Sequence, residues 1–235
     1  MGTRNRLSAV EWFLLGISFI AIVLMGWQVV AQGITYDSAF DMEAYNTISK
    51  AEFPSSLEQA YEVAPITSEF YGLLTFQVTE FVGSPFGVTI DPNRLESYQL
   101  HHGFIALLSV LGAVAIGSGT GVALRSRVSG LFAATLILVT PLWMGLGTMD
   151  HKDVPLAAGL SLLSLALTIS FTRTGWGWMA TAIGTGVAGT VVAFGTRAGS
   201  IALVVALVGI ALIVQVARAF VDRESSSLIR VIVVI

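Results

Sequence analysis

The stretch Gly147-Thr-Met-Asp-His-Lys-Asp-Val-Pro-Leu156 places four consecutive ionisable residues between two long apolar runs. We name residues 150–153, Asp150-His151-Lys152-Asp153, the charged turn. Ionisable side chains are costly to place in or near a bilayer, and those found there commonly mark functional sites. The charged turn therefore predicts a boundary between two helices and a functional site at the same place.

The composition of the whole chain is typical of a membrane protein. Of the 235 residues, 54% are hydrophobic and 11% are charged, and the mean hydropathy is +0.80. The chain has no cysteine, which excludes disulfides and thiolate metal ligands. The small net charge of −3 hides an asymmetry, since ten acidic but only two basic residues lie within 33–99.

Six apolar runs are long enough to cross a hydrocarbon core, which takes about 20 helical residues. They are residues 12–30, 104–124, 130–147, 154–171, 176–194 and 200–217. A last apolar run, 228–235, is the start of a seventh span cut by the end of the sequence. We therefore predict an all-α polytopic membrane protein with about six transmembrane helices and the start of a seventh, and expect an N-terminal fragment of a longer protein.

Basic residues near the span ends predict the orientation, because cytoplasmic loops are enriched in them. One side of the membrane would receive Arg4, Arg6, Arg125, Arg127, Arg173, Arg218 and Arg223. We predict a multi-pass protein of the cell membrane with a cytoplasmic N-terminus. The first span has about 19 apolar residues, more than the 7 to 15 of a signal-peptide core, so we expect it to be retained.

The opposite face then receives the charged turn and the segment 33–99, a long first extracytoplasmic loop. A loop of that length without structure of its own is uncommon, so we expect helices in it. Ser55 and Glu58 form a capping-box pattern. Further on, apolar residues recur at helical spacing, namely Ile66, Phe70, Leu73, Leu74 and Phe81, before turn-forming residues at 83–93 end the pattern.

Three acidic residues follow directly on the first span, in Gly33-Ile-Thr-Tyr-Asp37-Ser-Ala-Phe-Asp41-Met-Glu43. A carboxylate held just outside the membrane can act as a general base on a hydroxyl or as a ligand for a hard divalent cation. The alternative is a solvated acidic loop in which Asp37 caps a helix.

The charged turn has the form of a helix start, with Asp153 as the N-capping residue before Val154 and Pro155. The N-terminus of that helix, with Lys152 beside it, would suit a phosphate group. The alternative is an interfacial turn whose charges face water. Arg197, in the turn after the fifth predicted span, would bind an anion or anchor the helix end.

Glycine-rich patterns and a histidine pair have simpler interpretations. Gly184-Thr-Gly186-Val-Ala-Gly189 matches a dinucleotide pattern, but no strand precedes it, so close helix packing is favoured. Gly117, Gly119 and Gly121 have the same interpretation. For His101 and His102 an interfacial pair is favoured over a metal site, because no third ligand is fixed by spacing.

The arrangement resembles the GT-C class of membrane glycosyltransferases, in particular the protein mannosyltransferase and aminoarabinose transferase branch, of the family 39 type. The segment 150–157 resembles their Asn-Pro-Lys-Asp-Ile-Pro-x-Ala segment, with Asp150-His151 in place of Asn-Pro. Gly33-Ile-Thr-Tyr-Asp37 resembles the aspartate-bearing start of their long first outer loop. Ser38 follows Asp37 where many relatives have Asp-Glu, which leaves Asp37 and Asp41 as alternative catalytic carboxylates.

The resemblance implies an inverting glycosyltransferase, of the hexosyltransferase type, that moves a sugar from a polyprenyl-phosphate donor to an acceptor hydroxyl on a lipid, glycan or protein. Asp37 or Asp41 would take the proton at the extracytoplasmic face, and Mg²⁺ or Mn²⁺ would be the cofactor if one is used. The donor phosphate would be bound by Lys152, Asp153 and Arg197, with Glu43, Asp150, His151 and His102 as accessory residues. Full activity is expected to need the further spans of the relatives.

Two other functions remain open from the residues themselves. A transporter or flippase for an anionic lipid or solute would use the charged turn as a binding site, but such proteins tend to have inverted repeats and helices broken at mid-membrane. A structural or sensory subunit would use the acidic segment to bind a partner. Membrane lipid is an expected partner in each case, and nucleic acid is not.

Overall fold

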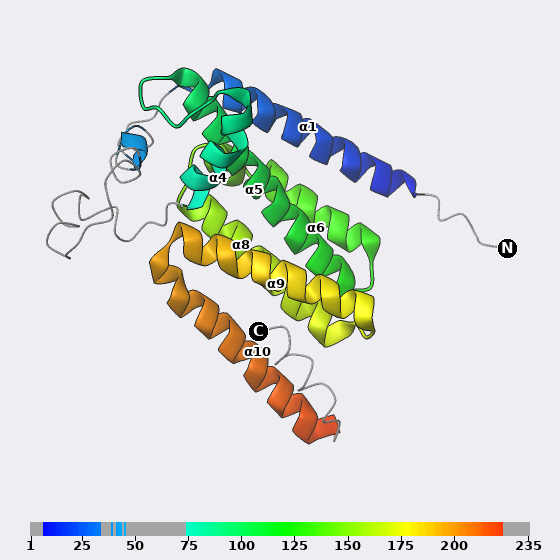
Figure 1. The fold of residues 1–235 in the computed structure, drawn as a ribbon. Helices are drawn as coiled ribbons and strands as arrows, with labels where there is room; N and C mark the ends of the chain where they lie inside the picture. The colour runs from blue at the N-terminus through cyan, green and yellow to red at the C-terminus, as the bar shows by residue number, and fades with distance from the viewer. Residues whose placement is uncertain (1–6, 34–38, 40, 44, 46–73, 223–235) are drawn as a thin grey trace, which may run out of the picture.

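A computed structural model describes residues 7–33, 39, 41–43, 45 and 74–222 of the chain (Figure 1). Within these residues the structure is helical and contains no β-strand. The helices are α1 (Ala9–Ala31), α4 (Leu74–Gly83), η2 (Ser84–Phe86), α5 (Leu95–Ala123), α6 (Arg127–Val139), α7 (Pro141–Leu146), α8 (Asp153–Thr172), α9 (Trp176–Thr196), η3 (Ala198–Ser200) and α10 (Ile201–Asp222).

Four of these helices, α1, α5, α8 and α9, are long and apolar enough to cross a membrane. Helix α6 and the Ile201–Val214 part of α10 are apolar but shorter, so the expected count of six spans is not confirmed. Several long apolar helices nevertheless fit a membrane protein. The seventh predicted span, 228–235, lies outside the described residues.

The predicted span 130–147 is not one uninterrupted helix. Helix α6 ends at Val139, Thr140 has an extended backbone with φ −65° and ψ 121°, and α7 begins at Pro141. Proline has no N–H for the helical ladder and disfavours helical geometry in the residue before it. Because residues 130–147 form one apolar run, hydropathy by itself did not indicate the break at Pro141.

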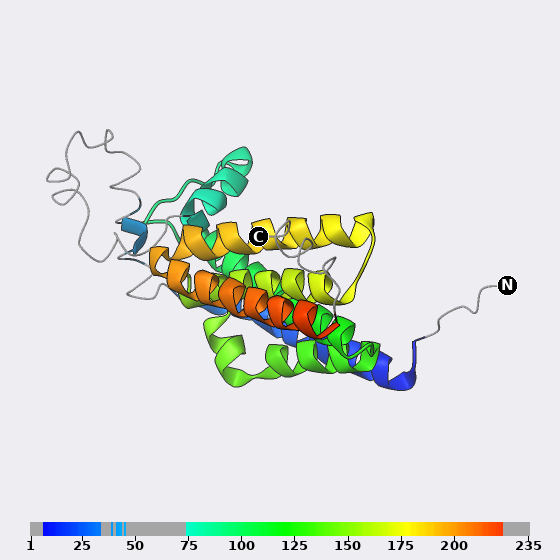
Figure 2. The same cartoon turned by 90° about the horizontal axis from the view of Figure 1, so that it is seen from below.

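Helix α8 lies in the middle of the bundle, packed against α5 and α9, while α6 and α1 pack against α5 (Figures 1 and 2). Helix α10 lies along the outer side of α8 and α9, where Val204 and Ala211 join Leu163 and Ala193 in one apolar cluster. A buried contact links α1 to α6, in which the hydroxyl oxygens of Ser18 and Thr135 lie 2.8 Å apart.

Glycines allow the closest helix contacts, as predicted for Gly189, Gly117 and Gly121. A Cβ atom on Gly189 of α9 would lie 2.6 Å from the carbonyl oxygen of Gly159 on α8. A Cβ on Gly117 of α5 would lie 2.7 Å from the carbonyl oxygen of Gly130 on α6. For Gly184 the structure shows no close packing, since no atom of the described residues lies within 4 Å of its Cβ position.

The contrast between two glycines on α9 gives a matched test of this packing. Gly189→Ala should lower the free energy of unfolding by about 1–3 kcal/mol, because the added methyl group meets backbone atoms of α8. Gly184→Ala should raise it by about 0.5–1 kcal/mol, because alanine is the better helix former and the site is open. Thermal unfolding in detergent would measure both, and equal effects of the two substitutions would contradict the proposed contact.

Candidate functional site

The charged turn lies at the end of the bundle where α1 ends, α5 and α8 begin, and α9 ends. We name this end of the bundle the histidine end, because His101, His102 and His151 all lie there. Thr148, just before the charged turn, donates a hydrogen bond of 2.8 Å to the side-chain oxygen of Gln32 at the end of α1. Helix α4 lies beside the start of α5, and Phe76 on α4 shares an apolar cluster with Met42 and Tyr98.

Asp41 is the carboxylate that meets the charged turn. Its Oδ2 atom lies 2.6 Å from His151 Nε2 and 2.8 Å from Lys152 Nζ. The side chains of Asp41 and His151 are only 12% and 7% exposed, so the contact is largely screened from water. The sequence left Asp37 and Asp41 as alternatives; Asp37 lies outside the described residues, whereas Asp41 contacts two residues of the predicted site.

The surroundings of Asp41 favour its ionised form. Burial alone raises the pKa of this carboxyl, but the hydrogen bonds and positive charge supplied by His151 and Lys152 outweigh burial, and the pKa lies below its ordinary value. Asp41 is therefore an ionised acceptor near neutral pH, held between a ring N–H and an ammonium group.

His101 and His102 lie near the start of α5, where neighbouring side chains bury them, and both are 0% exposed. The His101 ring stacks on Phe76 with the centroids 4.3 Å apart, and its Nδ1 lies 3.0 Å from the hydroxyl of Thr79. That hydroxyl donates to the carbonyl of Thr75, so it can only accept from His101, which places the imidazole proton on Nδ1.

Several imidazole nitrogens in this buried region are left with hydrogen-bonding capacity, among them both ring nitrogens of His102. His101 Nε2 and His151 Nδ1 are both buried and have no hydrogen-bond partner among the residues that the structure describes. The two rings lie 5.8 Å apart between centroids, and both contact Phe76. Buried polar atoms are normally satisfied, so this pair marks a place where a polar group of a ligand or a water molecule can bind.

Asp150, and not Asp153, caps helix α8. Its Oδ1 atom accepts hydrogen bonds from the backbone N–H groups of Lys152, at 3.0 Å, and Asp153, at 2.8 Å. The prediction that Asp153 is the cap is therefore wrong, because Asp153 is already the first residue of the helix. Its 64% exposed side chain instead accepts a 2.6 Å hydrogen bond from Arg197, which joins the start of α8 to the end of α9.

Helix α4 contributes residues that the sequence did not single out. Phe76, Thr79 and Glu80 lie on neighbouring turns, and Glu80 accepts a 2.5 Å hydrogen bond from the hydroxyl of Tyr45. Burial and this bond raise the pKa of Tyr45, which keeps the phenol protonated. Thr79 and Glu80 follow Phe76 by three and four residues, and this helical spacing is the signal that could have placed the three side chains on one face. The accessory candidate Glu43 is exposed.

The described residues do not form an assembled metal-binding site. No group of three His, Asp or Glu side chains that could hold an ion occurs within that part of the chain. Asp41, which would be the natural oxygen ligand, is already paired with His151 and Lys152.

Comparison of the chain with protein-family models, with curated proteins and with solved structures gives no match in any of the three. The function must therefore be argued from the site itself.

The paired state of Asp41 predicts how stability depends on pH. Its folded-state pKa is lowered from 3.8, so the ionised carboxylate stabilises the fold above that value, and this stabilisation is lost as the pH falls through the folded-state pKa. Asp41→Asn should cost about 1–3 kcal/mol at pH 7, because His151 and Lys152 each lose their contact with a charged carboxylate. The difference from the wild type should shrink below about pH 3.8. Thermal unfolding of both proteins from pH 3 to pH 7 measures the difference in stability between the wild type and Asp41→Asn. A difference that does not change with pH would contradict the pairing.

Proposed function

We propose that the chain belongs to an inverting glycosyltransferase that transfers a sugar from a polyprenyl-phosphate donor to an acceptor hydroxyl at the membrane surface. The observation that carries the proposal is the contact between the Asp41 carboxylate and His151 and Lys152 of the charged turn. It brings a candidate base from the first loop to the segment that resembles the donor-binding segment of the GT-C enzymes.

Proton transfer falls to Asp41 in this proposal. As the acceptor oxygen forms its bond to the anomeric carbon, the hydroxyl proton moves to the ionised carboxylate, and the bond between that carbon and the phosphate oxygen breaks with inversion. A positioned base of this kind contributes about 10² to 10⁴ in rate. His151 orients the carboxylate through its 2.6 Å hydrogen bond, which makes it a positioning residue.

Stabilisation of the leaving phosphate falls to the cations near the start of α8. Lys152 lies 2.8 Å from Asp41, so a phosphate beside it would be close to the reacting hydroxyl. Arg197 reaches Asp153 at the exposed edge of the same helix start and can exchange that carboxylate for phosphate oxygens. Asp153 then holds Arg197 in place before the donor binds. In this proposal the negative charge that develops on the leaving phosphate is stabilised by Lys152 and Arg197.

The orientation is part of the same proposal. Arg125, Arg127 and Arg173 lie at the end of the bundle opposite the histidine end, at the junctions between α5 and α6 and between α8 and α9. Enrichment of cytoplasmic loops in arginine supports an extracytoplasmic position for Asp41 and the charged turn.

The transfer activity can be tested in membranes that contain the full-length protein. Asp41→Asn should reduce transfer of labelled sugar from a synthetic polyprenyl-phosphate hexose by about 10² to 10⁴. Glu96→Gln is the matched control, because Glu96 is an exposed carboxylate of the same region that lies 3.8 Å from Arg94. Expression and thermal stability of each variant are measured alongside.

If Asp41→Asn transferred sugar at the wild-type rate, the assignment of Asp41 as the base would be wrong. If the wild type instead moves the intact lipid-linked sugar across vesicle membranes without releasing sugar, the transporter function replaces the proposed one. His151→Asn should lower the rate at saturating donor more than it changes the donor concentration for half-maximal rate, as expected of a positioning residue.

The orientation has its own test, because the chain has no native cysteine. A single cysteine at the exposed Ser84, at the histidine end, should react with an impermeant maleimide in intact cells. A single cysteine at the exposed Thr174, in the turn between α8 and α9, should react only after permeabilisation. The reverse pattern would overturn the proposed topology.

A further inference from the structure

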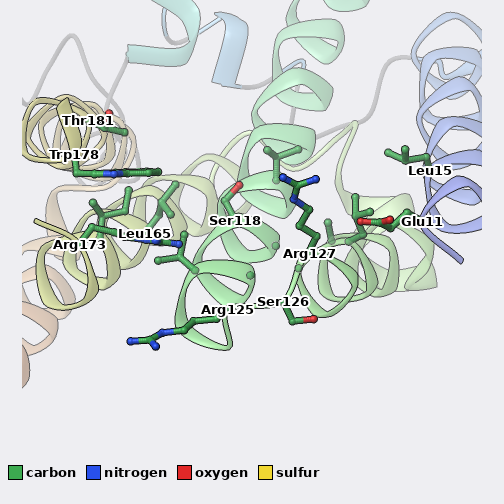
Figure 3. Close-up of a pocket in the computed structure, with 18 of the residues that line it drawn as sticks. Glu11, Leu15, Ser118, Arg125, Ser126, Arg127, Leu165, Arg173, Trp178 and Thr181 are labelled. Atoms are coloured by element: carbon green, nitrogen blue, oxygen red, sulfur yellow. The ribbon is translucent and has the colours of Figure 1, made fainter. Parts of the chain in front are cut away.

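A second site lies at the other end of the bundle, which we name the arginine end after Arg125, Arg127 and Arg173. A pocket of about 930 Å³ opens there between α1, α5, α6, α8 and α9. This volume is at the upper end of the roughly 300–1,000 Å³ of small-molecule sites. Figure 3 shows Arg173 and Trp178 on one side of the pocket, Glu11 and Leu15 on the other, and Arg127 between them.

The charge of the lining favours an anion. Its charged residues are three arginines and Glu11, which gives a formal charge of +2. The Glu11 carboxylate already accepts a 2.7 Å hydrogen bond from the backbone N–H of Ser8, as half of the capping box of α1. In the part of the chain that the structure describes, none of the three arginines has a carboxylate oxygen within 4 Å.

Arg173 is held ready for a ligand by an aromatic neighbour. Its guanidinium lies over the Trp178 ring, 5.2 Å from the centroid, across the turn between α8 and α9. Stacking of this kind orients the planar group and leaves its N–H donors at the edge. The hydroxyls of Ser118 and Ser126 add further hydrogen-bond donors to the same lining, whereas the Thr181 hydroxyl already donates to the carbonyl of Gly177.

The remainder of the lining is apolar and is formed by span-forming helices. Its apolar side chains include Leu15, Val114, Leu131, Ala134, Leu165 and Ile169. Helices α1, α5 and α8, which contribute four of these six residues, are among the four membrane-spanning candidates. The pocket thus has guanidinium groups at the helix ends and apolar side chains further along the helices. This arrangement matches an amphiphile with a phosphate headgroup and hydrocarbon chains.

We propose that this pocket binds one molecule of an anionic glycerophospholipid, with the headgroup at the arginine end of the lining and an acyl chain against the apolar part. Basic pockets between transmembrane helices on the cytoplasmic side are known to hold anionic headgroups. The site lies at the opposite end from Asp41, so it stands independently of the proposed transfer activity.

Native mass spectrometry of the delipidated full chain, titrated with phosphatidylglycerol, tests the proposal. The wild type should form a one-to-one complex, and phosphatidylcholine should bind at least tenfold more weakly. Arg127→Ala and Arg173→Ala should each weaken phosphatidylglycerol binding about fivefold, and the double variant about 25-fold. Arg94→Ala, an exposed arginine at the histidine end, is the matched control and should bind as the wild type does.

A second variant tests the pocket itself with all arginines intact. Ser118→Phe places a ring in the middle of the pocket from an exposed position on α5, and should also reduce binding at least tenfold. Leu107→Phe, at an exposed position of the same helix outside the pocket, should have no effect. Size-exclusion profiles and circular dichroism check the fold of each variant.

Several outcomes would overturn the proposal. Unchanged phosphatidylglycerol binding in the double variant, or equal binding of phosphatidylcholine, would remove the arginine site. Binding of many lipids without a saturable first one would indicate only a lipid annulus. Displacement of phosphatidylglycerol by millimolar inorganic phosphate would identify a simple anion site in place of a lipid site.

Discussion

The backbone contact between α8 and α9 is the constraint on which the rest of the structure depends. At Gly159 and Gly189 each helix leaves no room for a side chain of the other. Apolar side chains gain little from one another in lipid, so close van der Waals packing must hold such helices together. Accordingly 61% of the apolar window of α8 is buried, against 17% for α1, which makes α8 the axis of the bundle.

The central position of α8 explains the placement of the charged turn. The turn lies where α8 begins, so neighbouring helix ends surround it; His151 is buried there, whereas the Asp153 side chain remains 64% exposed. Asp150 satisfies the first backbone N–H groups, which leaves Asp153 for Arg197 and His151 and Lys152 for Asp41. Each ionisable side chain of the turn thus has a separate task, and a polar segment is accommodated next to an apolar bundle.

The two ends of the bundle use their charges differently. At the histidine end, cations are matched with carboxylates, so a ligand must exchange with an existing partner or use the imidazole nitrogens left over between His101 and His151. At the arginine end, three guanidinium groups line a largely apolar pocket, and none of them has a carboxylate oxygen of the described residues within 4 Å. The first arrangement suits controlled proton transfer, and the second suits a lasting anionic ligand.

The sequence predicted the helical class, the approximate location of most helices, and the charged turn as a helix boundary. These features depend on the length of apolar runs and on the proline or ionisable residues that interrupt them, and both are local properties of the chain. The sequence also predicted that Gly189 and Gly117 serve close packing. Other features were beyond it: the break at Pro141 was concealed by continuous hydropathy, and Gly184 was grouped wrongly with its neighbours because spacing along a helix does not say which face meets a partner.

Only the tertiary structure decided which residues share a site. Asp41 and His151 are 110 residues apart, and nothing in either local pattern specifies their contact; it arises because the ends of α1 and α8 meet and α4 packs against the start of α5. The burial of His101, the capping role of Asp150 and the pocket at the arginine end have the same origin. The sequence by itself determined which chemistry is available, whereas the packing of the helices determined which groups can act together.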